Sequence, residues 1–201
     1  MRNKFQLILA SASPRRRELL GWTFLPFKII PSEIEEVIES DIPTEVVESL
    51  AKQKAFDIWT KYPDAMVIGA DTIVVNEGKI LGKPHTKEVA RQMLSELSGK
   101  SHDVYTGICI LWQKEEILFH VHTKVNFLPI SEDIMEFYLN TNESLDKAGA
   151  YGIQGAALSF IDSIEGSYSN VVGLPVDKVL EKIKTLLMNK IGKSWRECFL
   201  E

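Results

Sequence analysis

Three consecutive arginines, Arg15 to Arg17, follow Ser13 and Pro14 near the start of the chain. Serine favours the N-cap of a helix and proline its first position, so a helix is predicted to begin at Pro14. Cations are unfavourable there, because the N-terminus of a helix carries partial positive charge. Two neighbouring arginines and the backbone N–H groups of the first turn would instead bind phosphate, with Arg17 at the surface. The alternative is that the arginines extend into water or pair with Glu18.

Two further charged residues stand where packing alone does not explain them. Lys54 lies on the apolar side of a helix predicted over residues 43–61. A lysine there needs a charged partner or a ligand, or it extends its ammonium into water. Asp71 interrupts the apolar strand predicted over residues 65–75, and Gly69 beside it indicates a bulge or a close backbone approach. This carboxylate could bind a divalent metal, orient a water molecule, or bond the backbone of its own turn.

Other polar residues are weaker indications. The acidic cluster of Glu33, Glu35 and Glu36 is by itself typical of a solvated loop. Lys83 follows a glycine and precedes a proline, but GKILGKP lacks the glycine spacing and the Ser or Thr of a P-loop. Gln154, in a glycine-rich loop, could read a base edge with its amide or bond the backbone.

The sequence lacks the residues that several other classes of reaction need. His120 and His122 have metal-ligand spacing on a strand face, but no third ligand accompanies them, so we expect exposed histidines. The segment GSYSN is not the nucleophile elbow of a serine hydrolase. Cys109 and Cys198 have no partner nearby, which predicts two free thiols. A site that binds phosphates and a divalent metal, and that uses water as the nucleophile, would account for all of these charged residues.

The bulk composition is typical of a globular protein of one domain or two small lobes. The chain has 201 residues, of which 45% are hydrophobic and 25% are charged. A net charge of −5 argues against a general nucleic-acid binder. No apolar run approaches the ~20 residues of a membrane span, and the N-terminal apolar stretch is too short for a signal peptide. We therefore expect a cytoplasmic protein with no membrane or nucleic-acid partner.

Strands and helices are predicted to alternate along the chain. The expected strands, beside the one that contains Asp71, cover residues 5–10, 26–31, 101–112, 116–129 and 158–164. The expected helices, beside 43–61, cover residues 14–21, 86–97 and 131–140, and a final helix starts at Pro175. Thr86 and Ser131 are expected to cap the helices that follow them. This mixture predicts an α/β fold with a mixed sheet, in which the long antiparallel strands form a second lobe beside a cleft.

Seven segments together resemble the Maf family of nucleoside triphosphate pyrophosphatases. In chain order they are LASASPRRRELL, LAKQKA, GADTIV, LGKP, LSGKSHDVYTG, DKAGAYGIQG and VVGLP, and the resemblance extends over residues 6–187. It implies one Maf-like domain over residues 1–201, with residues 188–201 a tail outside the pattern. The implied fold is that of the inosine triphosphate pyrophosphatases, a mixed, strongly bent sheet flanked by helices, with two lobes and a cleft. The implied reaction releases pyrophosphate and leaves a nucleoside monophosphate.

The resemblance also implies roles for individual residues. Those implied to hold the triphosphate are Ser11, Arg15, Arg16, Lys54 and Lys83. Asp71 would accept a proton from the attacking water or lie beside a metal, and Glu36 would help hold magnesium or manganese. Arg15, Thr72 and Gln154 match the subgroup that acts on dTTP and UTP rather than on 7-methyl-GTP.

Two other functions stay open at this point. The chain could bind a nucleotide without catalysis and regulate cell division or septum formation, as the family's historical name suggests. It could also bind nucleic acid through the arginine turn, although its net charge argues against this. Members of the family often form dimers, but no apolar strip in the sequence identifies an interface, so a homodimer is an open alternative. The physiological nucleotide, canonical or modified, is open as well.

Overall fold

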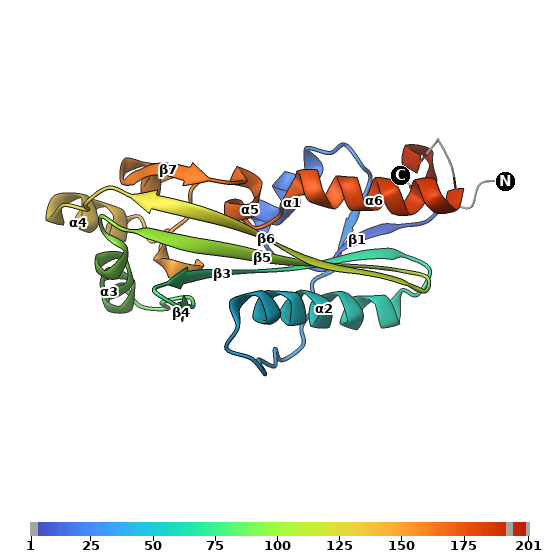
Figure 1. Cartoon of the computed structure of the whole chain (residues 1–201), viewed down its shortest axis with the longest axis horizontal. Coiled ribbons are helices and arrows are strands. Elements are labelled where there is room, and N and C mark those ends of the chain that lie inside the picture. Colours follow the sequence, from blue (N-terminus) through green and yellow to red (C-terminus); the bar gives the residue numbers. More distant parts are fainter. Residues whose placement is uncertain (1–3, 192–194, 200–201) are drawn as a thin grey trace. The chain divides into compact units, whose positions relative to one another are not determined.

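The computed structural model of the chain describes residues 4–191 and 195–199 (Figure 1). Its strands are β1 (Leu7–Leu9), β2 (Lys28–Ile29), β3 (Met66–Asn76), β4 (Lys79–Leu81), β5 (Ser101–Trp112), β6 (Glu115–Phe127) and β7 (Ile161–Glu165). Its helices are α1 (Pro14–Gly21), α2 (Pro43–Lys61), α3 (Lys87–Leu97), α4 (Glu132–Asn140), α5 (Tyr168–Val172) and α6 (Val176–Ile191). Shorter 3-10 turns are η1 (Ala148–Ala150), η2 (Ala156–Ser159) and η3 (Trp195–Cys198).

The strands form one sheet of mixed direction. Their order is β2-β1-β3-β5-β6-β7, with β4 paired to β3. β1 runs parallel to β2 and to β3, whereas β4 runs antiparallel to β3 and β7 antiparallel to β6. The predicted α/β class with a mixed sheet flanked by helices is therefore confirmed.

The chain divides into two compact units, which we describe separately. The first unit comprises residues 1–71, 106–120 and 173–201, and the second comprises residues 72–105 and 121–172. Strands β3, β5 and β6 each contribute residues to both units. The boundary in β3 falls between Asp71 and Thr72, so the predicted site residues are divided between the units.

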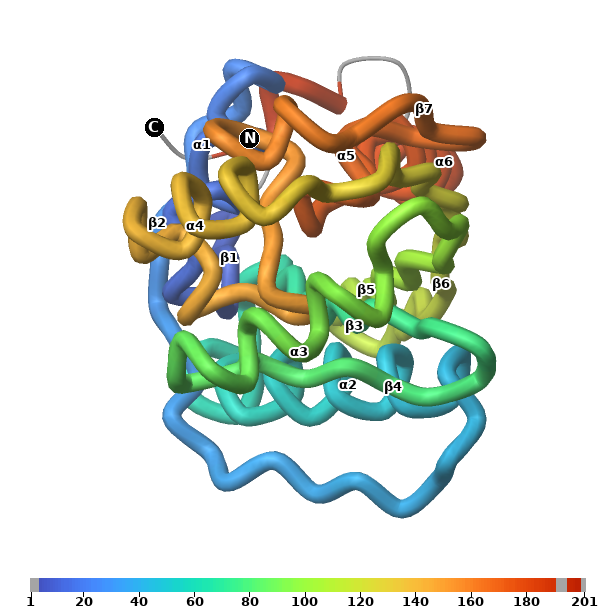
Figure 2. Tube along the Cα trace, turned by 90° about the vertical axis from the view of Figure 1, so that its left-hand side faces the viewer, coloured from blue at the N-terminus to red at the C-terminus, as the bar shows by residue number. Residues whose placement is uncertain are grey.

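In the first unit, α2 and α6 lie on opposite faces of the strands (Figures 1 and 2). α2 approaches β3 and β5 so closely that side chains are excluded at two points. A Cβ atom at Gly69 would lie 2.2 Å from the carbonyl oxygen of Ala51, and one at Gly107 would lie 2.1 Å from that of Val47. The predicted interruption of the strand at Gly69 is wrong, because β3 runs continuously through it. Gly69 marks a close approach of two backbones, which is one of the two alternatives that the sequence indicated for it.

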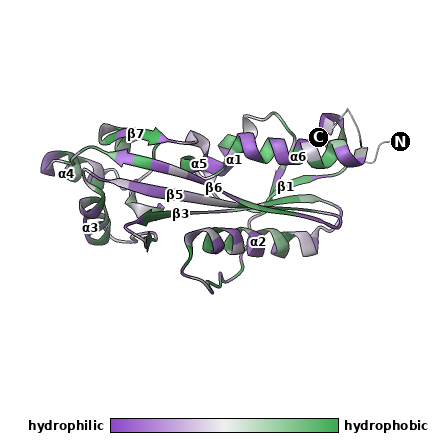
Figure 3. Ribbon diagram, viewed as in Figure 1, coloured by the Kyte–Doolittle hydropathy of each residue, from purple (hydrophilic) through white to green (hydrophobic). Residues whose placement is uncertain are grey.

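The helices that were predicted from N-capping residues and prolines begin at the predicted positions. α1 starts at Pro14 and α2 spans residues 43–61, and the Thr86 hydroxyl accepts a hydrogen bond from the Val89 amide at 3.3 Å. Ser131 precedes α4, but its hydroxyl contacts Asp133 instead of capping the backbone. Figure 3 shows hydrophilic and hydrophobic residues alternating around α2 and α6, the pattern of helices with one buried face.

Three predicted strands are shorter than expected. β1 covers Leu7–Leu9 where residues 5–10 were expected. β2 has two residues where residues 26–31 were expected, since it lies at the sheet edge and pairs only with the three-residue β1. The start of the segment predicted as a strand over residues 158–164 belongs to the turn η2, at which Ala157 and Phe160 are buried three residues apart. Only β7 follows as an extended element.

Of the predicted tail at residues 188–201, the structure places residues 188–191 in α6 and describes residues 195–199, which contain η3. Residues 192–194, 200 and 201 lie outside the described residues. None of the helices in the described part of the chain combines the length and the apolar character needed to cross a bilayer.

Candidate functional site

The first turn of α1 has the geometry that its sequence predicts. The Ser13 hydroxyl accepts a hydrogen bond from the Arg16 amide at 3.4 Å, and Pro14 is the first helical residue. The Ser11 hydroxyl, which follows β1, accepts from the Ser13 amide at 3.3 Å. Arg15 is half-buried and Arg17 is exposed. The expectation that Arg17 is an ordinary surface residue is therefore confirmed.

Arg16 is held by acceptors from three separate segments of the first unit. Its Nε donates to the carbonyl of Gly173 at 2.8 Å, and its Nη1 donates to the carbonyl of Ala70 at 2.9 Å and to the Ser11 hydroxyl at 3.2 Å. Burial lowers the pKa of the Arg16 guanidinium from its usual value, and the negative charge of Asp71 acts in the opposite direction. The structure thus fixes a cation beside the end of β1, next to the α1 turn.

Lys54 joins two carboxylates in the same unit. Its ammonium lies 2.6 Å from Oδ1 of Asp71 and 2.8 Å from Oε1 of Glu36. The side chains of Lys54 and Asp71 are 15% and 14% exposed, whereas that of Glu36 is 44% exposed. The expectation that a lysine on the buried side of α2 has a charged partner is confirmed, and the partners are the two acids that the resemblance singles out.

Glu36 reaches this cluster from a segment without secondary structure between β2 and α2. Gln53, the neighbour of Lys54 on α2, holds the next residue of that segment through its backbone. The Val37 amide donates to Oε1 of Gln53 at 3.0 Å, and Nε2 of Gln53 donates to the Val37 carbonyl at 2.7 Å. Two consecutive residues of α2 therefore bind two consecutive residues of the acidic loop.

The carboxylates suit a hard divalent cation. Magnesium is commonly held by one or two protein carboxylates, with phosphate oxygens and water completing its ligands. Glu36 and Asp71 supply such a pair, because both carboxylates converge on the ammonium of Lys54. Within residues 4–191 and 195–199, no group of three or more His, Cys, Asp or Glu residues could hold a metal. A metal at this pair would therefore need further oxygens from a bound phosphate or from water.

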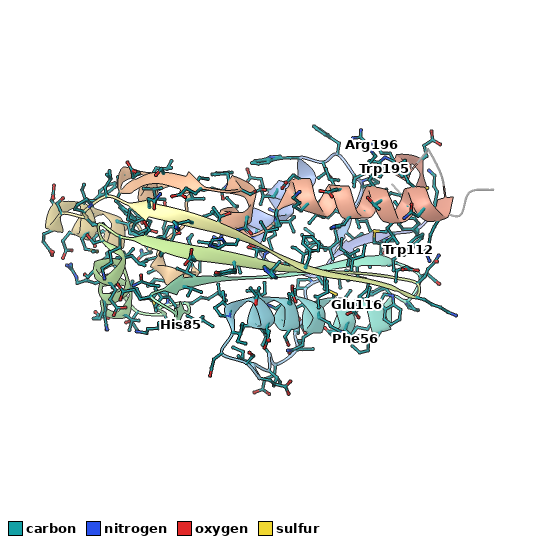
Figure 4. All side chains as sticks on the ribbon, viewed as in Figure 1. Phe56, His85, Trp112, Glu116, Trp195 and Arg196 are labelled. Carbon is teal, nitrogen blue, oxygen red and sulfur yellow. The ribbon has the colours of Figure 1, made fainter. Side chains whose placement is uncertain are left out.

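The remaining predicted residues lie in the second unit. Thr72 is half-buried on β3, Lys83 is exposed in the loop between β4 and α3, and Gln154 is half-buried between η1 and η2. Figure 4 labels His85, which marks the loop of Lys83. The Gly149 amide donates to the Gly82 carbonyl at 3.1 Å. The structure thus ties the segment of Lys83 to the segment of Gln154.

The rejected metal pair behaves as expected. His120 lies 2.7 Å from Glu48, and His122 lies 2.6 Å from Asp103 and stacks on Tyr105, with both histidines exposed. As predicted, neither Cys109 nor Cys198 forms a disulfide, and both are buried.

Some site contacts had no usable signal in the sequence. The carbonyl of Gly173 orients Arg16, but a backbone acceptor cannot be recognised from its residue type. The positive φ of 118° at Gly173 is the one indirect sign, because glycine is favoured there. Gln53 stands beside Lys54 in LAKQKA, yet only the structure shows that it holds Val37.

Known proteins share most of this sequence. The family model described as Maf-like protein matches residues 6–186. A dTTP/UTP pyrophosphatase of Symbiobacterium thermophilum is 48% identical over 179 residues, which cover 89% of this chain and 92% of that protein. Proteins of the same name from Pyrococcus abyssi and Bacillus cereus are 49% and 45% identical to this chain. Each match covers 89% of this chain, and it covers 95% of the Pyrococcus protein and 94% of the Bacillus protein.

A comparison of structures gives a more distant match. The Staphylococcus aureus Ham1 protein has a TM-score of 0.42 and 14% identity, over 61% of this chain and 71% of that chain. The assignment to a family rests on the sequence matches, which extend through α1, the segment of Lys54 and Asp71, and the glycine-rich loop. The chain belongs to the Maf family.

Proposed function

We propose that this chain is a nucleoside triphosphate pyrophosphatase that hydrolyses dTTP and UTP to the monophosphate and pyrophosphate. The observation that carries the proposal is the cluster in which Lys54 bridges Asp71 and Glu36. Relatives 45–49% identical over 89% of the chain are named dTTP/UTP pyrophosphatases, which supports this substrate class.

The role proposed for Ser11, Arg15 and Arg16 is to bind the phosphates. A guanidinium group donates N–H groups to phosphate oxygens, and a helix N-terminus adds backbone N–H groups. Nε and Nη1 of Arg16 donate to protein acceptors, and Nη2 is the nitrogen of Arg16 that we assign to a phosphate oxygen. The three acceptors around Arg16 fix its side chain before a nucleotide binds, so little conformational entropy remains to be lost. Lys54 and Lys83 are proposed to neutralise further phosphate oxygens.

Asp71 is proposed to accept the proton of the attacking water. The water oxygen forms a bond to the α-phosphorus, the bond from that phosphorus to the bridging oxygen breaks, and pyrophosphate leaves. Because Lys54 donates to Oδ1, we assign the proton to Oδ2. Glu36 and Asp71 are the residues that would hold a magnesium or manganese ion, which supplies charge neutralisation at the phosphates when bound.

Base selection is assigned to residues on β3, on α1 and in the glycine-rich loop. The amide of Gln154 can donate to and accept from a pyrimidine edge, and Thr72 and Arg15 complete the set that matches the dTTP and UTP subgroup. The cytoplasm stays the expected location. A homodimer stays an open alternative.

The test is pyrophosphate release from a panel of dTTP, UTP, CTP, GTP and 7-methyl-GTP, first with magnesium and then with manganese. Fast release from dTTP and UTP alone is the expected result. Release mainly from another nucleotide would keep the reaction and overturn the specificity. Tight nucleotide binding without release from any substrate would favour the regulator of cell division over an enzyme.

A further inference from the structure

A buried polar pair in the second unit has no part in the function proposed so far. His102 of β5 and Tyr151, which follows η1, are 2% and 5% exposed, and Nε2 of His102 lies 2.7 Å from the hydroxyl of Tyr151. Their rings meet edge to face, with centroids 5.2 Å apart. Each also packs edge to face on Phe127, at 4.7 Å and 4.8 Å.

Burying this polar pair lowers the stability of the fold compared with apolar side chains at the same two positions. Within the described residues, Nδ1 of His102 is buried without a hydrogen-bond partner. Burial lowers the pKa of His102 to about 4 and raises the pKa of Tyr151, so both are neutral at pH 7. A buried polar atom without a partner destabilises a protein by roughly 1–3 kcal/mol. The hydrogen bond to Tyr151 therefore needs an explanation other than packing.

The loop that contains Tyr151 has a strained backbone. Gly149 and Ala150 both have a left-handed conformation, with φ of 66° and 64°, and Gly155 has φ of 99°. Ala150 is fully buried, and this conformation is uncommon for a residue with a Cβ atom. Such a conformation persists only where several contacts determine it together.

Several contacts surround this strained segment. The Gly149 amide binds the Gly82 carbonyl, and a Cβ atom at Gly149 would lie 2.9 Å from Val74. At the far end, the Ala156 amide donates to Oε2 of Glu143 at 3.3 Å. Between these ends, the His102–Tyr151 bond ties the middle of the loop to β5. Gln154 lies three residues after that anchor.

We infer that His102 is a positioning residue, which acts through Tyr151 to hold residues 147–156 in the conformation that presents Gln154 to the base of the nucleotide. This inference rests on the proposed function for the identity of the ligand and for the role of Gln154. The anchoring itself is a property of the second unit. The imidazole is suited to the task, because its ring packs among aromatics while one nitrogen fixes the direction of the Tyr151 side chain.

The experiment is a double-mutant cycle with His102→Leu, Tyr151→Phe and the combined variant. Tyr151→Phe removes a single oxygen atom and retains the ring, so it is the variant least able to disturb folding. His120→Leu, at an exposed histidine of β6 that contacts Glu48 and lies outside the proposed site, is the matched control. His102→Gln is the conservative variant, because its amide can still donate to the tyrosine hydroxyl.

Each variant is measured by KM and kcat for dTTP, by the ratio of kcat/KM for dTTP to that for GTP, and by hydrogen exchange of the amides of residues 148–155. We expect His102→Leu and Tyr151→Phe to raise KM and lower the ratio roughly 3–10-fold, with kcat changed less than about 2-fold. Their effects should not add in the combined variant, because they remove one shared bond. Amide exchange in the loop should be faster in all three, and His102→Gln should restore part of the ratio.

The outcomes separate this inference from the proposed function. If the loop exchanges at the wild-type rate in Tyr151→Phe, the anchor does not hold the loop and the inference is wrong. If exchange is faster but the dTTP preference is unchanged, the pair is a core contact without a role in selection. If the wild-type protein releases no pyrophosphate from dTTP, the proposed function fails, and the exchange data still decide whether His102 orders the loop.

Discussion

The ammonium of Lys54 lies 2.6 Å from Oδ1 of Asp71, and both side chains are mostly buried. The partners come from α2 and β3, which approach each other closely at Gly69. A close approach of this helix and this strand therefore brings a lysine to an aspartate that lies 17 positions further along the chain. The same ammonium also reaches Glu36, so one cation organises both proposed metal-side carboxylates.

Asp71→Asn should leave the fold intact and lower turnover by about 10²–10⁴-fold, because the amide cannot accept the proton of the attacking water. Pyrophosphate release under saturating dTTP measures this, and circular dichroism checks the fold. Turnover near the wild-type value would remove Asp71 from the role of proton acceptor.

Gln154→Ala should reduce the discrimination between pyrimidine and purine triphosphates, because an alanine offers no hydrogen bonds to a base edge. The measurement is kcat/KM for dTTP, UTP and GTP with the same preparation. Gln92→Ala, at a glutamine of α3 that binds Glu96, is the control and should leave the ratios unchanged. An unchanged ratio in Gln154→Ala would contradict the assignment.

Gln53→Ala should loosen the loop that carries Glu36, because it removes both hydrogen bonds to the backbone of Val37. The Val37 amide should exchange with solvent roughly 5-fold faster, the size expected for about 1 kcal/mol of lost local protection. We also expect weaker manganese binding in the absence of nucleotide, measured by titration. Unchanged exchange at Val37 would show that other contacts hold the loop.

Gly69→Ala should destabilise the protein by more than about 2 kcal/mol, because the new Cβ atom would lie 2.2 Å from the backbone of α2. Gly21→Ala is the matched control, since nothing lies within 4 Å of a Cβ atom there. Its free energy of unfolding should change by less than about 1 kcal/mol. Denaturant unfolding measures both, and equal effects would disprove the close packing of α2 on β3.

The burial of His102 predicts a loss of stability in acid. Its pKa is about 4 in the folded chain and 6.5 as the ordinary value, so between these pH values the unfolded chain binds more protons. The contribution of His102 to the free energy of unfolding should therefore be fully present above pH 6.5. It should decrease as the pH falls toward 4, by up to about 3 kcal/mol. The difference in unfolding free energy between the wild type and His102→Leu, measured from pH 7 to pH 4.5, isolates this contribution. A difference that does not change with pH would contradict it.

The parts of this structure that depend on local signals could be predicted from the sequence. Ser13 and Pro14 set the start of α1, and the periodicity of residues 43–61 places Lys54 on the buried side of α2. Both results follow from rules that act within a few residues of the chain.

The parts that depend on distant contacts could not be predicted in the same way. Glu36 lies in a segment without periodicity, and only resemblance to a family separated it from an ordinary acidic loop. Gly69 was predicted to mark a bulge or a close backbone approach, but the sequence does not reveal that the backbone of α2 is what lies against it. The partners His102 and Tyr151 are 49 positions apart, and each taken alone resembles an ordinary core residue.

The hydrogen bond between Gly149 and Gly82 has a thermodynamic consequence for the proposed enzyme. Lys83 follows one of these glycines and Gln154 follows the other by five positions, so a residue assigned to the phosphates and a residue assigned to the base share one linkage. Binding at either end then alters the free energy of ordering the other, and by reciprocity the two effects are equal in size. Affinity for the pyrophosphate group and selectivity for the base should consequently vary together across variants of these two loops.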